Sequence, residues 1–297
     1  MQSNTFMAIG ECMLELSGVG PGLWRQKFAG DTFNTAWHFR RETGEDWEVQ
    51  YFTAVGDDHA SHAMRDFMNA QKIGTRFVQT VPGKAPGLYM IHVDEGERSF
   101  SYWRDQSAAR DLADDAAALK DAFYTADALY FSGITLAVLP PKGRKNLLSA
   151  LAEARGMGKT VAFDTNIRPR LWQGPDDMRQ VLMQGAAVSD IVLPGYDDEA
   201  LAFGDATPAD VAQRYAAQGA GEVVVKNGGA DCTILTGGDA VVVPGQSGVE
   251  LVDTTGAGDS FNGGYLAARL SGADPVEAAQ KGHRLAARVI GSSGALV

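Results

Sequence analysis

Short runs of apolar and β-branched residues alternate along this chain with longer segments whose apolar positions follow helical spacing. The short runs predict strands at residues 6–10, 50–55, 128–132, 160–164, 191–194 and 223–226. The longer segments predict helices at residues 32–42, 59–73, 141–155, 176–189, 208–218, 257–270 and 275–290. Strands that alternate with helices build a mostly parallel sheet with helices on both faces. We therefore expect an α/β fold in which residues 1–297 form a single domain.

One region departs from this alternation. Residues 88–93 and 99–104 predict a β-hairpin with Gly96 in its turn. Because alternate residues of a strand share a face, Tyr102 and Arg104 point to the same side. A surface that carries Tyr and Arg is suited to a small polar ligand. Taken alone, the hairpin favours an ordinary solvated edge over a ligand-binding surface.

The composition excludes several classes of protein. The 297 residues include 26 Lys and Arg against 37 Asp and Glu, which gives a net charge of −11. An acidic chain argues against nucleic acid or an anionic membrane as a partner, and an anionic substrate needs a local basic pocket. The two cysteines, Cys12 and Cys232, cannot make a disulfide scaffold, so we expect a cytoplasmic location. We see no signal peptide, and the weakly polar run at 128–141 is too short to span a bilayer.

The most specific motif is Asp253-Thr-Thr-Gly-Ala-Gly-Asp-Ser-Phe261, which leads straight into a predicted helix. Free N–H groups and the positive end of the helix dipole make such a start an anion site. Asp259 lies in the first turn beside it, where a carboxylate can take a proton from an attacking hydroxyl. An Asp is also common at any helix start, so the residues alone leave both interpretations open.

The whole nine-residue string resembles the second signature of the ribokinase-like (PfkB) carbohydrate kinases. The segment Ala29–Ala36 is similar to the sugar-binding motif of that family, with Ala29 in place of the first Gly. The resemblance implies a ribokinase-like fold with a small β-strand lid, and ATP and Mg²⁺ as cofactors. It implies that Asp259 is the catalytic base and that the backbone N–H groups of Gly256, Ala257 and Gly258 form the anion hole. It also implies that sugar hydroxyls are held by Gly30, Asp31 and Asn34.

Four further segments resemble the branch of this family that phosphorylates 2-dehydro-3-deoxygluconate: Pro86–Tyr89, Gly96–Arg104, Ser132–Ala137 and Phe163–Trp172. In that branch the hairpin belongs to the lid, which implies that Tyr89, Tyr102 and Arg104 face the sugar acid. Arg suits a substrate carboxylate because its planar fork donates two parallel hydrogen bonds. A kinase of a neutral sugar has no need of that charge.

Two more segments extend the expected site. Asn166 and Arg168 follow a predicted parallel strand at the end where open α/β sheets bind ligands. Arg168 is suited to contact the substrate and to neutralise the transferring phosphoryl group, with a structural salt bridge as the alternative. The segment that begins at Lys226 resembles the family's nucleotide loop, although Asn227 replaces an expected Arg. The resemblance implies that ATP contacts Asn166, Lys226, Gly228, Gly229, Gly256 and Gly258.

The family's acidic Asn-x-x-Glu motif falls at Gly195–Asp198, where the Asn is missing and the Glu is shortened to Asp. We therefore assign no metal ligand, although Asp198 and Glu199 remain able to act through water. There is no Walker A motif, which argues against a P-loop kinase. The five histidines show no metal-ligand spacing.

These observations predict an ATP-dependent kinase that phosphorylates the carbon-6 hydroxyl of 2-dehydro-3-deoxy-D-gluconate. One alternative is a kinase of another sugar, such as fructose or ribose, against which Arg104 counts. The other is a non-catalytic sugar sensor on the same scaffold, against which the intact Asp259 counts. Family members are often homo-oligomers, but the sequence points to no interface.

Overall fold

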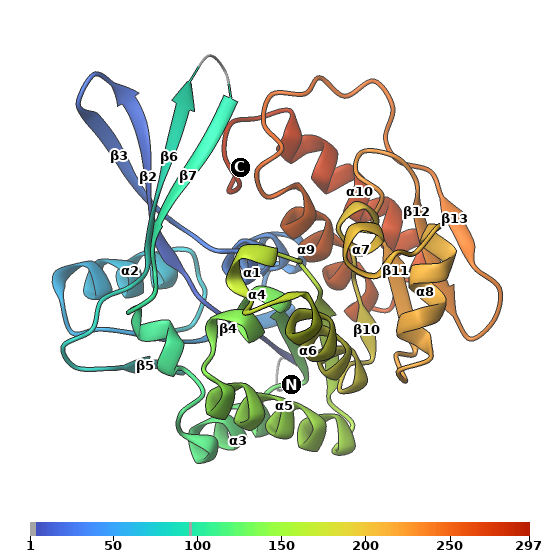
Figure 1. Ribbon diagram of the computed structural model, residues 1–297, viewed down its shortest axis with the longest axis horizontal. Coiled ribbons are helices and arrows are strands. Elements are labelled where there is room, and N and C mark those ends of the chain that lie inside the picture. Colours follow the sequence, from blue (N-terminus) through green and yellow to red (C-terminus); the bar gives the residue numbers. More distant parts are fainter. Residues whose placement is uncertain (1–3, 95–96) are drawn as a thin grey trace.

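The computed structural model describes residues 4–94 and 97–297, so the predicted turn at Gly96 lies outside the described residues. Within them, one large sheet and one small sheet are seen (Figure 1). In spatial order, the large sheet contains β13 (Val241–Val243), β12 (Cys232–Thr236), β11 (Glu222–Val225), β10 (Ile191–Val192), β9 (Thr160–Asp164), β8 (Ala128–Ser132), β1 (Asn4–Ile9), β4 (Trp47–Val55) and β5 (Val78–Thr80). The strands from β11 to β5 are parallel, and β12 and β13 add antiparallel to that edge.

Helices cover both faces of the large sheet, as the alternating pattern predicts. One face carries α1 (Asp31–Thr43), α2 (His59–Ala70), α9 (Ala257–Leu270) and α10 (Pro275–Ile290). The other carries α3 (Ala116–Thr125), α5 (Pro141–Gly156), α6 (Pro175–Ala187) and α8 (Pro208–Ala216). The short helices α4 (Gly133–Val138) and α7 (Tyr196–Phe203) follow β8 and β10. No helix among the described residues is long and apolar enough to cross a bilayer.

The central strands are apolar throughout because both of their faces are buried. In β1, Phe6 faces one core and Met7 the other. Phe6 stacks on Phe39 of α1, with ring centroids 3.9 Å apart. On the opposite face Phe131 stacks on Phe163, with centroids 4.6 Å apart. Two cores of this kind fix the sheet rigidly, so the loops at its carboxyl edge start from firm positions.

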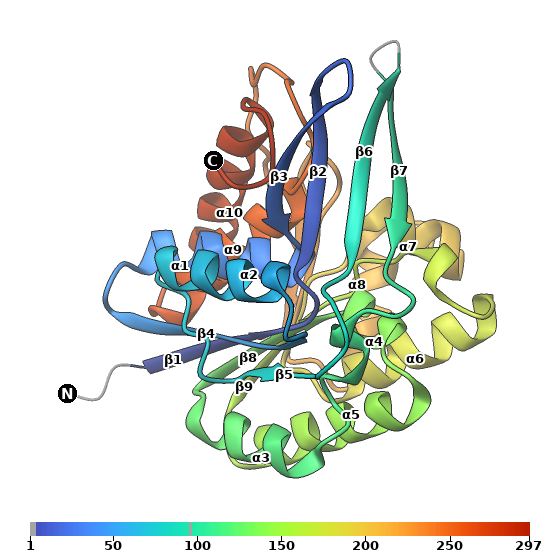
Figure 2. The same cartoon turned by 90° about the vertical axis from the view of Figure 1, so that its left-hand side faces the viewer.

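The small sheet forms the predicted lid and rises from one side of the body (Figure 2). Its strands are β3 (Leu23–Ala29), β2 (Met13–Gly20), β6 (Leu88–Asp94) and β7 (Glu97–Trp103), in that order. β2 and β6 are parallel, while β3 and β7 pair antiparallel with them. The predicted hairpin is therefore only half of the lid, since β2 and β3 were not predicted.

Several element boundaries differ from the prediction by one to three residues, and three elements show local reasons. β10 stops at Val192 rather than at 194, where Pro194 lacks the N–H that a ladder needs. α2 stops at Ala70 rather than at 73, and Lys72 takes the left-handed φ of +59°. α6 begins at Pro175, a favoured first helical residue, and ends at Ala187.

Candidate active site

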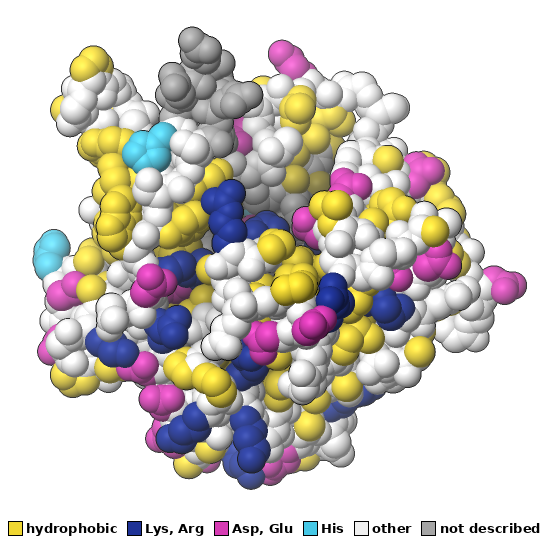
Figure 3. Space-filling model, viewed as in Figure 1, with side chains coloured by type: hydrophobic (Ala, Val, Ile, Leu, Met, Phe, Trp, Pro, Cys, Tyr) yellow, Lys and Arg dark blue, Asp and Glu magenta, His cyan; other side chains and the backbone are white. Residues whose placement is uncertain are grey.

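The predicted site residues meet at the carboxyl edge of the parallel strands, beneath the lid. This edge receives the start of α1, the loop after β9, the loop after β11 and the start of α9. Figure 3 shows that the surface is hollowed between the lid and the helices of the body. Open α/β sheets bind their ligands at this edge, so the location agrees with the expected site.

The predicted anion loop is a turn closed by glycine. Gly256 has the left-handed φ of +75°, and a Cβ there would lie 2.6 Å from the Cβ of Ala295. Both features require glycine. The N–H of Ala257 donates to the carbonyl of Thr254 over 3.2 Å, so this turn already uses one of the three expected donors. Gly256 and Gly258 show no such backbone partner among the described residues, and their N–H groups remain for an anion.

Asp259 lies in the first turn of α9 and is only partly exposed. Burial raises the pKa of its carboxyl to about 8, and the negative charges of Asp31 and Asp164 contribute to the rise. A 2.8 Å hydrogen bond from Asn34 Nδ2 and the ammonium group of Lys226 oppose it. A carboxylate whose pKa lies near neutral pH is suited to general base catalysis.

The sugar motif forms the first turn of α1 and packs directly on the loop after β1. A Cβ on Gly30 would lie 2.2 Å from the carbonyl oxygen of Glu11, so only glycine fits. Asp31 Oδ2 accepts a 2.9 Å hydrogen bond from Asn166 Nδ2, which places Asn166 beside the segment Ala29–Ala36. The amide of Asn34 accepts from the N–H of Gly30 at 3.4 Å and donates to the base. Its observed partners therefore make it a support of the Asp259 carboxylate.

Lys226 lies at the end of β11, and its ammonium group reaches the start of α9. It donates to Asp164 Oδ1 at 3.1 Å and to Asn262 Oδ1 at 3.0 Å. Asn262 Nδ2 in turn donates to Asp164 Oδ2 at 2.8 Å. A Cβ on Gly258 would lie 3.8 Å from Lys226 Nζ, so a positive charge stands beside the anion loop. This arrangement favours binding of a phosphate there.

The predicted nucleotide loop is the turn between β11 and β12. Gly228 has the left-handed φ of +56°. Both Gly228 and Gly229 are exposed, and a side chain at either position would meet open space. The loop therefore offers bare backbone to a ligand lying over it.

The lid tyrosines share a face of the small sheet. Tyr89 of β6 pairs with Tyr102 of β7, and their rings stack with centroids 5.9 Å apart. Tyr102 is half exposed, whereas Tyr89 is buried and donates its hydroxyl proton to Glu15 of β2. Tyr102 therefore keeps an exposed side chain on this face, while the hydroxyl of Tyr89 is engaged within the lid.

Arg104 follows β7 directly and is buried. Its Nη2 forms an ion pair with Glu11, which is buried beneath the lid between β1 and β2. The sequence predicts that Arg104 faces a substrate carboxylate and gives no sign of a second carboxylate. The structure supplies that second carboxylate from the protein itself.

Arg168 is the predicted charge-neutralising residue, and it is half exposed at the mouth of the site. Its Nη1 lies 3.6 Å from Asp198 Oδ2 and donates to the carbonyl of Ile167 at 2.8 Å. Burial raises the pKa of Asp198, and the positive charge of Arg168 opposes the rise. The next residue, Glu199, is fully buried and paired with Arg214 at 2.8 Å. Of Asp198 and Glu199, only Asp198 therefore reaches the site.

Four polar residues of the site were missed by the sequence analysis: Glu11, Glu15, Asp164 and Asn262. Asp164 closes a predicted strand two residues before Asn166, and Asn262 lies three residues after Asp259 on one helix face, so both had a readable signal. Glu11 and Glu15 had none, because their partners lie 93 and 74 residues away. Among residues 4–94 and 97–297, no group of three or more His, Cys, Asp or Glu is placed to hold a metal ion.

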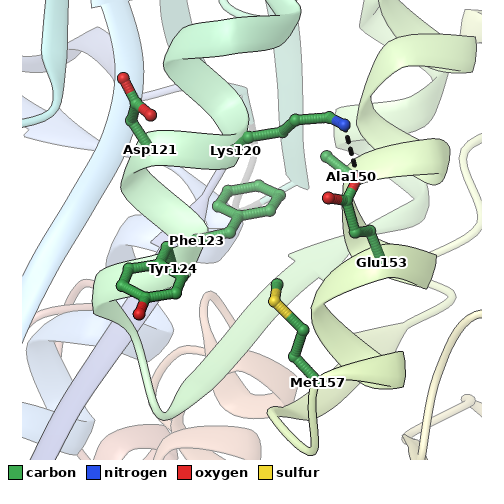
Figure 4. Close-up of a pocket in the computed structure, with 7 residues that line it drawn as sticks. All are labelled: Lys120, Asp121, Phe123, Tyr124, Ala150, Glu153 and Met157. Carbon is green, nitrogen blue, oxygen red and sulfur yellow. Dashed lines mark ion pairs between the residues drawn. The ribbon is translucent and has the colours of Figure 1, made fainter.

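A surface cavity of about 180 Å³ lies elsewhere, between α3 and α5 (Figure 4). Lys120 and Glu153 bridge it with a 2.6 Å ion pair, and Tyr124 and Met157 line its other end. Tyr124 lies four residues before the start of β8, and Met157 lies three residues before the start of β9. The cavity therefore lies toward the amino ends of those strands. It is therefore separate from the site at their carboxyl ends.

Comparison with known proteins decides the family. The model of the pfkB family of carbohydrate kinases matches residues 4–297. The chain belongs to this family. It is therefore a carbohydrate kinase, an enzyme that transfers a phosphoryl group to a hydroxyl. It is 40% identical to the 2-dehydro-3-deoxygluconokinase of Escherichia coli K12, over 99% of this chain and 97% of that protein.

Two further proteins are similar to this chain. The fructokinase of Vibrio alginolyticus is 30% identical over 75% of this chain and 71% of its own. The crystal structure of a fructokinase with bound ATP from Xylella fastidiosa superimposes with a TM-score of 0.86. It is 20% identical, and the match covers 98% of this chain and 94% of that one. The last comparison confirms the predicted ribokinase-like fold.

Proposed function

We propose that this kinase transfers the γ-phosphoryl group of ATP to the carbon-6 hydroxyl of 2-dehydro-3-deoxy-D-gluconate. The observation that carries the proposal is the contact between Asn34 of the sugar motif and Asp259 at the start of α9. It brings a carboxylate of raised pKa, an anion loop and a sugar-binding segment to one point. We treat residues 1–297 as one kinase domain that includes the lid.

Asp259 removes the proton from the hydroxyl as its oxygen attacks the γ-phosphorus. The new oxygen–phosphorus bond forms as the bond to ADP breaks, and the proton passes to the carboxylate. The N–H groups of Gly256 and Gly258 and the ammonium group of Lys226 stabilise the negative charge that develops. A lid closed over the sugar excludes water that would otherwise accept the phosphoryl group.

ATP lies along the exposed Gly228–Gly229 turn with its phosphates at the start of α9. The Xylella fructokinase of the same fold carries bound ATP, which supports this assignment. Mg²⁺ would be held by one or two carboxylates together with substrate phosphates and water. Asp198, half exposed beside Arg168, fits that limited role. When bound, the ion neutralises phosphate charge, and Arg168 adds to this at the mouth of the site.

The sugar acid is the substrate that Arg104 favours. The 40% identity to the Escherichia coli enzyme over nearly the whole chain supports this choice. Tyr102 and Arg104 lie on the lid, with Gly30 and Asp31 at the base of the site. A guanidinium group there provides the local positive charge that an anionic substrate needs on a protein of net charge −11.

A neutral hexose such as fructose is the second candidate substrate. The observation that favours it is the ion pair of Arg104 with Glu11, which leaves the pocket with less positive charge than Arg104 alone would give. The similarity to the Vibrio fructokinase, which is 30% identical to this chain and is named for a neutral sugar, also supports this candidate.

Release of ADP from purified protein tests the proposal. The panel contains 2-dehydro-3-deoxygluconate, its galactonate epimer, fructose and ribose, each with ATP and Mg²⁺. We expect the highest kcat/KM on the sugar acid and a product phosphorylated at carbon 6, identified by phosphorus–proton coupling. A higher kcat/KM on fructose supports the second candidate, and no ADP release on any sugar supports a sensor.

A further inference from the structure

The pair formed by Glu11 and Arg104 is a feature that packing alone does not explain. Both side chains are buried, with 2% and 9% of their surfaces exposed. Even so, Glu11 Oε1 and Arg104 Nε have no hydrogen-bond partner among the described residues. A buried ion pair that leaves such atoms unsatisfied contributes little net stability, since desolvation offsets the attraction.

Glu11 is itself held firmly from both sides. Its backbone lies under Gly30, where a Cβ would approach its carbonyl oxygen to 2.2 Å. Its carboxylate lies under Gly87, where a Cβ would approach Oε1 to 2.6 Å. Gly30 belongs to the sugar motif, and Gly87 immediately precedes the lid strand β6. Glu11 therefore joins the floor of the sugar site to the base of the lid.

Arg104 is held much less firmly by its own element. It follows the last residue of β7, the edge strand of the lid sheet, and its long side chain has many rotamers. An ion pair through Nη2 alone fixes one corner of the guanidinium group. A guanidinium has five donors, so one carboxylate can fix it while another binds a different edge.

We propose that Glu11 is a positioning residue that orients Arg104 for the substrate carboxylate and thereby favours an acidic sugar over a neutral one. This inference rests on the proposed function. Glu11 lies two residues after the end of β1, so it transmits the geometry of the core to a side chain on the lid. Without it, the guanidinium group turns toward other anions of the site.

A double-mutant cycle tests the inference, with Glu11→Gln, Arg104→Ala and the combined variant. Glu11→Gln keeps the shape of the side chain and removes its charge. We expect it to raise the KM for 2-dehydro-3-deoxygluconate by about tenfold to a hundredfold, the scale for a misplaced binding group. The KM for ATP should change by less than about twofold, because Arg104 does not bind the nucleotide.

The decisive comparison is Glu11→Gln in the background of Arg104→Ala. If Glu11 acts through Arg104, the second substitution changes kcat/KM by less than about twofold. Equal losses in both backgrounds overturn the inference, and so does an unchanged or lower KM for the sugar acid in Glu11→Gln alone. Glu11→Asp, which keeps the charge but withdraws it, should lie between wild type and Glu11→Gln, and it provides the test if Glu11→Gln does not fold.

Glu222→Gln is the matched control. Glu222 is the first residue of β11 and is also a buried glutamate in an ion pair. Its Oε2 lies 3.0 Å from Nε of Arg269. This variant should lower thermal stability and leave the KM for the sugar acid unchanged. The proposed function is tested separately, by the activity of wild type on the sugar acid. That activity is measured first, and the double-mutant cycle then compares the variants with it.

Discussion

The pKa of Asp259 predicts how activity and stability depend on pH. Its value of about 8 in the folded protein replaces 3.8 in a free carboxyl, mainly because of burial. Only the ionised form can accept the proton of the hydroxyl. About one molecule in ten is therefore ready at pH 7, and kcat/KM should rise about tenfold per pH unit up to 8 and then level off.

The same pKa predicts a gain of stability when the charge is removed. A carboxyl whose pKa is higher in the folded than in the unfolded protein contributes stability that is fully present below pH 3.8. This contribution to the free energy of unfolding is lost as the pH rises through about 8. The difference corresponds to at most roughly 6 kcal/mol at high pH, at 1.36 kcal/mol per pH unit. Asp259→Asn should therefore melt at a higher temperature than wild type above pH 8, and at nearly the same temperature near pH 4.

The assay combines kcat/KM for 2-dehydro-3-deoxygluconate from pH 5.5 to 9.5 with thermal unfolding from pH 4 to 9.5. Asp259→Asn should lower kcat by about 10² to 10⁴ above pH 8, and its difference from wild type should shrink as the pH falls and the wild-type carboxyl becomes protonated. The exposed Asp239 provides the matched control, since Asp239→Asn should alter neither property. A wild-type profile that is flat between pH 6 and 8, or a variant that melts lower at pH 9, refutes the reasoning.

Three further variants probe the surroundings of the base. Asn34→Ala removes the amide that donates to Asp259, so the rise of kcat/KM should move to higher pH, as the same profile would show. Lys226→Met removes the ammonium group beside the anion loop, so kcat should fall by about tenfold or more. Single-turnover measurements by stopped flow should show that the phosphoryl-transfer step is the one that slows. Gly256→Ala forces a left-handed φ and a 2.6 Å contact with Ala295, so it should destabilise the fold by about 1–3 kcal/mol in denaturant titrations and lower kcat.

The large sheet could be predicted because its signals are local. β8, β9, α9 and α10 begin and end where the sequence places them. Fully buried strands are continuous apolar runs in the sequence. The start of α10 is indicated by a capping Asp followed by Pro275. β3 was missed for the opposite reason. Most of its residues are exposed, so it lacks both an apolar run and a clear alternation.

The site could be predicted only as far as its residues are neighbours in the sequence. The loop at Gly256–Asp259 is one motif, and its residues do lie together. The contact of Asn34 with Asp259 joins residues 225 apart, and the pair of Arg104 with Glu11 joins residues 93 apart. Spacing along the chain carries no information about such contacts. The partner of Arg104 therefore emerged only from the fold.

The selectivity for a sugar acid is the central claim, and kcat/KM on 2-dehydro-3-deoxygluconate and on fructose, for wild type and Arg104→Ala, tests it most directly. We expect wild type to prefer the sugar acid. Arg104→Ala should lower kcat/KM for the sugar acid by an amount that corresponds to roughly 2–5 kcal/mol of lost binding energy, the cost of leaving a buried carboxylate unpaired. It should change kcat/KM for fructose much less. Arg104→Lys should recover only part of the loss. A wild type that prefers fructose, or an equal loss on both sugars in Arg104→Ala, contradicts the account.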